Sequence, residues 1–344
     1  MIRTVQTSLN QLLRINLPIV QAPIGDATCP ALAAAVSNAG GLGMLALSLA
    51  DADTIRRSIS QTRNLTDRPF GVNLILEWPQ GERLQACLEE GVEVISFFWG
   101  DPSSYVEAVH SADARVMHTV SSAEEARRVV EAGVDVVVAQ GWEAGGHVWG
   151  EVATMPLVPR IVDVIHPMPV VAAGGIADGR GVAAALALGA SGAWIGTRFL
   201  MSEEALVPSA YRELLVRASE TDTVYSHVFD KGWPDAPHRA LRNSTIKRWE
   251  EAGCAPSGQR PGEGEDIAAF ADGEPIQRYA DVHPVSGMVG DLEALALYAG
   301  QSVGLVARTQ PAGEIVRDLA DETTRTLEQG ARLVKHEKKG PQTA

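Results

Sequence analysis

The sequence predicts a closed (β/α)8 barrel, a TIM barrel, with an appended, mainly helical lid segment toward the C-terminus. Residues 1–200 alternate short, almost continuous apolar runs with helical stretches, which is typical of a parallel sheet covered by helices. Eight such units occur in about 180 residues, enough for a compact closed barrel. An open doubly wound sheet is the alternative, but its G-x-G-x-x-G turn is missing after the first strand, where the chain reads PIGDAT at 23–28.

The expected strands are the apolar runs, and the expected helices lie between them. The strands are 19–24, 42–47, 70–76, 94–99, 115–120, 136–140, 170–173 and 193–195. Helix candidates include 30–38, 52–62, 83–90, 122–132, 155–164 and 181–188. Several of these helices begin after Ser, Asp or Thr and end near Gly, as helix caps require.

The composition of the chain changes after Ser202. The residue pattern predicts further helices at 205–219, 291–298 and 314–333. Residues 221–279 contain Pro, Gly, Trp and charged residues in a mixed order. We expect residues 1–202 and 311–335 to form the barrel and a helix packed on it. Residues 203–310 are then a lid that shapes the substrate pocket, and residues 336–344 a disordered tail.

Charge and cysteine content exclude several classes of function. The 43 acidic and 29 basic residues give a net charge of −14, which argues against nucleic acid or an anionic membrane as a partner. The three cysteines lack the spacing of a disulfide framework or a zinc site, so we expect no metal and a reduced, cytoplasmic setting. The first residues do not resemble a signal peptide.

The glycines after the last two predicted strands indicate a phosphate site. Gly174 and Gly175 follow the seventh strand, and Gly196 and Thr197 follow the eighth. Backbone N–H groups at the ends of these strands can converge on a phosphate, and TIM barrels commonly bind phosphate there. The alternative is that these glycines only make tight turns.

Other strand ends provide candidate pocket residues. His147 follows two glycines on what we expect to be a flexible rim loop, where an imidazole can reach a substrate. Asn73 can donate to and accept from a heterocycle edge. Trp99 and His118 end the fourth and fifth strands and could face a flat ligand. A phosphate site, flat walls, one mobile histidine and no nucleophile–base pair together suggest flavin mononucleotide, FMN.

The same motifs resemble those of the nitronate monooxygenase (2-nitropropane dioxygenase) family and the related flavin-dependent enoyl-acyl-carrier-protein reductase. They are QAPI at 21–24, GGLGML at 40–45, FGVNLIL at 70–76, the stretch 121–147 ending in AQGWEAGGH, AAGGIADG at 172–179 and AGQSVGLV at 299–306. The resemblance covers residues 17–335 and implies non-covalent FMN.

The family pattern also implies roles for individual residues. FMN would be contacted by Ala22, Pro23, Ile24, Asn73, Gln140, Gly145, Gly146, Gly174, Gly175, Trp194, Ile195, Gly196 and Thr197. His147 matches the family's active-site histidine, which serves as a base for neutral nitroalkanes or polarises the substrate. Gln301 and Ser302 would close the pocket.

Two positions depart from the family pattern. Many relatives carry a lysine where this chain has Thr119 beside His118, so His118 would have to supply the missing charge near the flavin. One subgroup continues its histidine with Pro-Gly-Glu, where this chain reads His147-Val148-Trp149-Gly150.

The leading hypothesis is an FMN oxidoreductase that oxidises alkyl nitronates with O2 to a carbonyl compound and nitrite. The second is an NAD(P)H-dependent flavin reductase of an enoyl thioester or a quinone, and the third is a flavin-binding protein without turnover. In each case the partners are small molecules, and the oligomeric state is left open, a homodimer included.

Overall fold

The computed structural model describes residues 5–334, which contain eight parallel strands arranged as a barrel. The strands are β1 (Ile19–Gln21), β2 (Gly43–Ala46), β3 (Phe70–Ile75), β4 (Val94–Phe98), β5 (Arg115–Val120), β6 (Val136–Gln140), β8 (Val170–Ala173) and β9 (Gly192–Ile195). From β2 to β9 each of these strands pairs in parallel with the next, and β9 pairs with β1. The barrel closes where Leu42, just before β2, bridges Val20 of β1.

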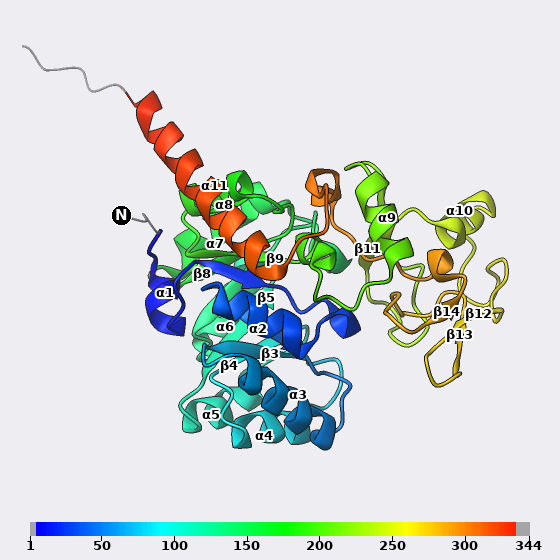
Figure 1. Cartoon of the computed structure of the whole chain (residues 1–344), viewed down its shortest axis with the longest axis horizontal. Helices are drawn as coiled ribbons and strands as arrows, with labels where there is room; N and C mark the ends of the chain where they lie inside the picture. The colour runs from blue at the N-terminus through cyan, green and yellow to red at the C-terminus, as the bar shows by residue number, and fades with distance from the viewer. Residues whose placement is uncertain (1–4, 335–344) are drawn as a thin grey trace, which may run out of the picture.

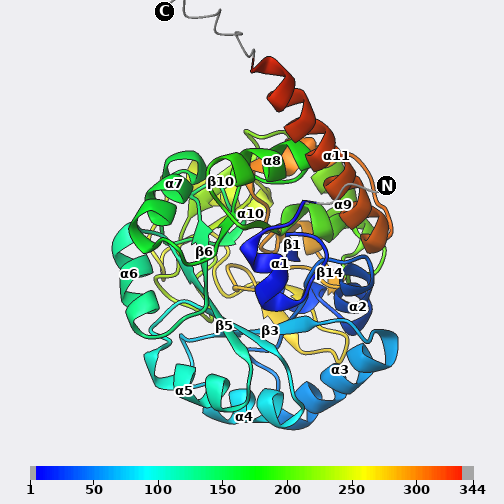
Figure 2. The same ribbon diagram turned by 90° about the vertical axis from the view of Figure 1, so that its left-hand side faces the viewer.

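Helices surround these strands, as Figure 2 shows in a view along the barrel axis. They are α2 (Pro30–Asn38), α3 (Ala52–Leu65), α4 (Gly81–Glu89), α5 (Ser103–Ser111), α6 (Ala123–Glu131), α7 (Thr154–Ile165) and α8 (Gly179–Ala187). Side chains of Asp51, Ser122 and Asp178 accept hydrogen bonds from the first turns of α3, α6 and α8, so these three residues are N-caps.

Helix α11 (Ala312–Leu333) fills the last place in the ring, between α8 and α2 (Figure 1). The Glu322 carboxylate accepts a 2.7 Å hydrogen bond from the N–H of Gly179, and Thr323 Oγ1 donates to the Gly179 carbonyl. Only a glycine fits there, because a Cβ on Gly179 would lie 2.5 Å from Glu322 Cβ. The expected helix at 314–333 is confirmed, whereas the tail at 336–344 lies outside the described residues.

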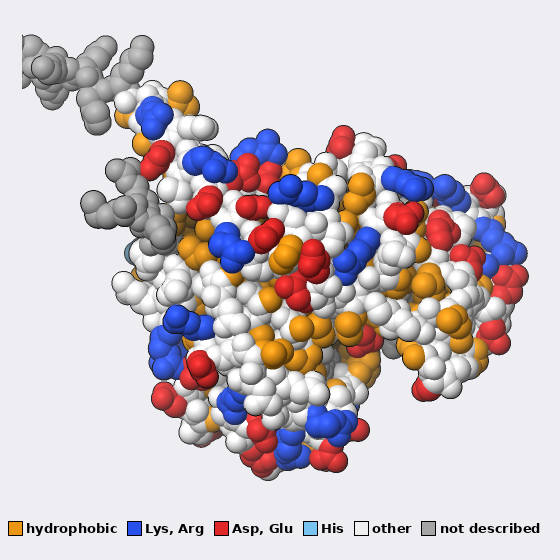
Figure 3. Space-filling view, viewed as in Figure 1, with side chains coloured by type: hydrophobic (Ala, Val, Ile, Leu, Met, Phe, Trp, Pro, Cys, Tyr) orange, Lys and Arg blue, Asp and Glu red, His pale blue; other side chains and the backbone are white. Residues whose placement is uncertain are grey.

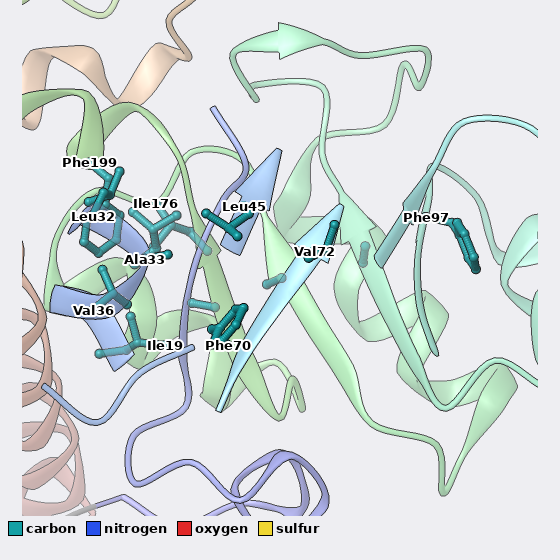
Figure 4. Close-up of a cluster of buried hydrophobic side chains, with 14 of the residues drawn as sticks. Ile19, Leu32, Ala33, Val36, Leu45, Phe70, Val72, Phe97, Ile176 and Phe199 are labelled. Atoms are coloured by element: carbon teal, nitrogen blue, oxygen red, sulfur yellow. The ribbon is translucent and has the colours of Figure 1, made fainter. Parts of the chain in front are cut away.

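The apolar core has two layers. One lies between strands and helices, and Figure 4 shows part of it, with Val36 of α2 beside Ile19 and Leu32 beside Phe199. The other fills the barrel with alternate strand residues, among them Val20, Met44, Met117, Val138 and Trp194. Helix α1 (Ser8–Leu13), which the sequence reading missed, adds Leu9 and Leu13 to this inner cluster and plugs the amino-terminal end of the barrel.

The lid lies over the opposite, carboxyl-terminal end of the barrel and is less helical than expected (Figure 1). Besides α9 (Ser209–Arg217) and α10 (Ser244–Glu251) it contains β10 (Thr223–Ser226), β11 (His238–Leu241), β12 (Asp266–Ala269), β13 (Pro275–Gln277) and β14 (Val289–Gly290). Strands β12, β13 and β14 form one antiparallel sheet, and β10 and β11 form another with β7 (Gly146–His147).

The helix expected at 291–298 is wrong. Only a short 3-10 turn, η3 (Leu292–Ala294), forms there. Residues 294–297 are all buried in succession, a pattern that no amphipathic helix has. They run as an irregular segment instead, with the Leu297 carbonyl accepting from Leu241 N–H and Ala296 N–H donating to Val282.

The outer surface mixes charges of both signs, with an indentation between the barrel and the outer part of the lid (Figure 3). Among residues 5–334, no helix combines the length and apolarity needed to cross a membrane.

Candidate active site

Four of the expected pocket residues lie on the inner side of the barrel mouth. Ala22 and Trp194 pack with the side chains that fill the barrel. Asn73 lies two residues after Gly71, whose Cβ position faces Met44, and Gln140 lies two residues after Val138 of the inner cluster. Since strand side chains alternate between faces, both amides point inward. Ile195 belongs to the outer layer, so only its backbone is available to a ligand at the mouth.

Buried polar atoms at this mouth lack partners within the described residues. Gln140 Nε2 donates to the carbonyl of His147 at 3.1 Å, but Gln140 Oε1 has no partner. Ser96 Oγ, which the sequence reading did not single out, is also buried and unpaired. Buried polar groups in proteins are almost always satisfied, so these atoms fit a ligand that presents its own polar edge.

The two glycine turns lie beside this mouth. Gly174 and Gly175 have φ values of 98° and 71°, a region that favours glycine. A Cβ on Gly174 would lie 2.9 Å from the carbonyl oxygen of Gly141. In the described part of the chain, the N–H groups of Gly175, Gly196 and Thr197 donate to no acceptor. The turns therefore form an open cradle of backbone donors, as an anion requires.

The segment containing Gln301 and Ser302 returns to the same place. Gln301 N–H donates to the carbonyl of Glu143 at 3.0 Å, and Gly300 N–H donates to Thr197 Oγ1 at 3.0 Å. Gly145 permits this contact, because a Cβ there would lie 2.4 Å from the nitrogen of Gly300. Residues about 150 positions apart thus meet beside the glycine turns, and Ser302 is buried there.

His147 lies in β7, which pairs with β11 of the lid, so the expected flexible loop is wrong. Its side chain is only 10% exposed, and the Trp233 ring centroid lies 4.1 Å from its own. Burial, with a smaller contribution from His283, lowers the pKa of His147 to about 3. The imidazole is therefore neutral near pH 7 and available to accept a proton.

Four polar residues around His147 were missed by the sequence reading: His238, Asp281, His283 and Tyr298. Asp281 Oδ2 lies 3.5 Å from His147 Nε2, and the Tyr298 hydroxyl donates to Asp281 Oδ1. Burial raises the pKa of Asp281. All four come from the lid, where no periodic pattern indicates which side chains turn toward the barrel.

Aromatic rings form a continuous wall beside His147. Trp99 lies 4.9 Å from Trp233 and 4.7 Å from Trp149 between ring centroids, and Trp149 lies 5.2 Å from Phe98. Trp99, one of the expected pocket residues, has a φ of 66°, a strained value for a tryptophan that places its ring against Trp233. The wall makes this side of the site apolar.

His118 and Thr119 face opposite sides of β5. Met117 fills the barrel, so Thr119 also points inward and His118 points toward the helix layer. Burial lowers the pKa of His118 to about 4, partly offset by Asp101. His118 is therefore neutral near pH 7 and turned away from the mouth, so it does not supply the charge that we expected of it there.

A parallel (β/α)8 barrel with a donor cradle on its last strands and unpaired amides at its mouth is the framework of a cofactor-dependent enzyme. Comparison with known proteins identifies the family. The family model "Nitronate monooxygenase" matches residues 6–83 and 78–322, and the chain belongs to this family. It is accordingly an enzyme, a flavin oxidoreductase, and the reading as a protein without turnover is not supported.

Three relatives illustrate the range of the family. A Rhodococcus jostii (3aS,4S,5R,7aS)-5-hydroxy-7a-methyl-1-oxo-octahydro-1H-indene-4-carboxyl-CoA dehydrogenase is 37% identical over 73% of this chain and 69% of its own. The structure of FabK from Thermotoga maritima has a TM-score of 0.84 and 38% identity, covering 96% of this chain and 100% of FabK. A nitroalkane oxidase from Streptomyces ansochromogenes has a TM-score of 0.76 and 32% identity, over 95% of this chain and 99% of that one.

Proposed function

We propose that this chain is an FMN-dependent nitronate monooxygenase that oxidises alkyl nitronates with O2 to a carbonyl compound and nitrite. We further propose that it accepts neutral nitroalkanes and forms the nitronate at His147. The observation that carries this proposal is a buried, neutral imidazole that packs against the aromatic wall and follows Gln140 at the barrel mouth. The family model and the likeness to a nitroalkane oxidase support it.

FMN fits the residues at the barrel mouth. The cradle of Gly174, Gly175, Gly196 and Thr197 offers N–H donors to one phosphate, which favours the mononucleotide. The unpaired Gln140 Oε1 and the inward Asn73 amide would bond the edge of the ring system. The remaining contacts would come from Ala22, Pro23, Ile24, Gly145, Gly146, Trp194 and Ile195. When bound, FMN supplies the electron transfer between substrate and O2.

His147 would take the proton of the substrate carbon. Its Nδ1 has no hydrogen-bond partner among the described residues, and unlike Nε2 it is not sealed from solvent. A nitroalkane is a neutral carbon acid, so it enters an apolar site at a lower desolvation cost than its anion does. The aromatic wall at Trp99, Trp149 and Trp233 would hold the alkyl part and exclude water.

Oxygen uptake and nitrite release by the purified FMN-loaded enzyme test the proposal. We expect both with ethylnitronate and with nitroethane. His147→Ala should lower kcat/KM for nitroethane by about 100-fold or more, the usual contribution of a general base. Nitronate turnover no faster than that of free FMN would contradict the proposed function.

A reductase of enoyl thioesters is the second candidate, favoured by the likeness to FabK and to a relative named as a carboxyl-CoA dehydrogenase. The discriminating measurement is anaerobic. Rapid bleaching of the bound flavin by NADH or NADPH would favour the reductase, whereas bleaching by nitronate alone would favour the oxidase.

A further inference from the structure

We infer that Asp281, contributed by the lid, is the positioning residue of His147. It fixes which ring nitrogen carries the proton and balances the charge that the ring gains when it takes a proton from the substrate. The inference rests on the proposed role of His147 as a base.

The geometry leaves Asp281 as the acceptor for His147 Nε2. This nitrogen is buried, forms no hydrogen bond within the described residues, and lies 3.5 Å from Asp281 Oδ2. The carboxyl group is held from its other side by the Tyr298 hydroxyl, and the Asp281 N–H donates to the carbonyl of Lys231 at 2.9 Å. A proton on Nε2 then lies next to the Asp281 carboxyl group, and Nδ1 is left with the lone pair that a base needs.

The other titratable groups nearby cannot take this role. His238 is engaged at both nitrogens, with Nδ1 3.0 Å from the Ala236 carbonyl and Nε2 accepting from Phe229 N–H at 3.2 Å. Among the described residues, His283 is buried against Gly25 and forms no hydrogen bond with His147, and Asp281 is the group within ion-pair distance of His147 Nε2.

Among the described residues, no Lys or Arg forms an ion pair with Asp281, and His147 is its one ion-pair partner. His238 and His283 also act on the Asp281 carboxyl group electrostatically, but His147 is the partner within ion-pair distance, so an imidazolium there would meet the Asp281 charge directly.

Asp281 acts at the moment of proton transfer. Before transfer, a neutral ring faces the carboxyl group across 3.5 Å. The proton then moves from the substrate carbon to Nδ1, the C–H electron pair stays on the substrate as the nitronate, and the new imidazolium lies beside the carboxylate. Because this attraction exists only once the proton has moved, it lowers the barrier rather than tightening substrate binding. It also explains how a ring so strongly disfavoured as a cation by burial can act as a base.

Asp281→Asn tests this role, because the two substrates of the proposed reaction differ in their need for a base. Nitroethane must lose a proton in the site, whereas ethylnitronate has already lost it. We expect kcat/KM for nitroethane to fall by about 100-fold or more and that for ethylnitronate to change by less than about threefold. Asp272→Asn, an exposed carboxylate of the lid, is the matched control and should alter neither value.

Equal losses on both substrates, or no loss on either, would overturn the inference, since a residue that only holds the fold cannot distinguish them. A second readout does not depend on turnover. In 15N-histidine NMR spectra of the FMN-loaded protein, with His147 assigned from His147→Gln, we expect the Nε2–H tautomer in the wild type and its loss in Asp281→Asn. A wild-type enzyme inactive on both substrates would contradict the proposed function, and the tautomer would then decide the role of Asp281 alone.

Discussion

Single backbone positions at the ends of β8 and β9 determine whether the barrel mouth can hold a phosphate. Gly174 combines a φ of 98° with a Cβ position 2.9 Å from the Gly141 carbonyl oxygen. Gly175, at 71°, has ordinary space around its Cβ position, so it is restricted by conformation alone. The turn is therefore more sensitive to a side chain at Gly174 than at Gly175.

Gly174→Ala should accordingly reduce bound FMN. The added methyl group must displace the Gly141 turn, and the backbone must hold a conformation that alanine disfavours by about 1 kcal/mol. The flavin-to-protein absorbance ratio after purification, with a titration of added FMN, measures the effect. Gly81→Ala is the control, since nothing lies within 4 Å of a Cβ there. Full flavin content in Gly174→Ala would contradict the phosphate cradle.

Whether a site residue could be predicted depended on its distance from a regular strand. Asn73 lies within an apolar run, and His147 and the glycine turns follow such runs. The ends of these runs can be counted in the sequence, and the barrel brings them together. Strand alternation also separates Thr119 from His118, a distinction available once the register is known. Asp281 and Tyr298 follow irregular segments, so nothing local indicated that they face His147.

At the scale of elements, the barrel strands were predictable and the lid was not. Each barrel strand is an apolar run covered on both faces, so its place in the chain follows from hydrophobicity. The expected bounds match at residues 136–140, whereas the first strand ends at Gln21 and not at residue 24. The lid strands are short and pair in ways set by tertiary contacts. Strand β7 has two residues and exists because β11 lies beside it. Such pairings leave no periodic signal.

Arg260 is a buried contact that holds the loop 254–266 to the rest of the lid. Its guanidinium pairs with Asp230 and Glu263, donates to the carbonyl of Val228, and lies 4.3 Å from the ring centroid of Tyr279. The side chain is only 4% exposed, so solvent screens these contacts weakly.

Arg260→Ala should open this part of the lid while the barrel stays folded. Removing the cation leaves partly buried carboxylates unpaired, which costs on the order of 2 kcal/mol. Hydrogen exchange should rise within 254–266 and stay unchanged in β4–β6. Arg248→Ala is the control, because that arginine and its partner Glu265 are about half exposed and such pairs contribute little. Equal exchange in the two variants would show that Arg260 does not hold the loop.

At the scale of the whole molecule, buried neutral histidines make the fold sensitive to acid. Burial lowers the pKa of His147 to about 3 and those of His118 and His238 to about 4, and it also lowers that of His283. Asp281 acts in the opposite direction, because its raised pKa lets the folded state take up a proton. Four histidines that resist protonation in the folded state have a larger effect on the pH dependence of stability than one carboxyl group that favours it.

The free energy of unfolding should therefore fall as the pH drops from 7 to 5. Below the ordinary histidine pKa of 6.5 the unfolded chain binds protons that the folded chain excludes, so stability rises with pH across this window and levels off above it. Each buried histidine contributes a slope of up to about 1.4 kcal/mol per pH unit. Urea unfolding at pH 5, 6, 7 and 8 measures it. His118→Asn should make the slope shallower, whereas His227→Gln, at an exposed histidine, should leave it unchanged. A free energy of unfolding that stays constant from pH 5 to 8 would contradict this prediction, because the folded chain would then bind as many protons as the unfolded chain.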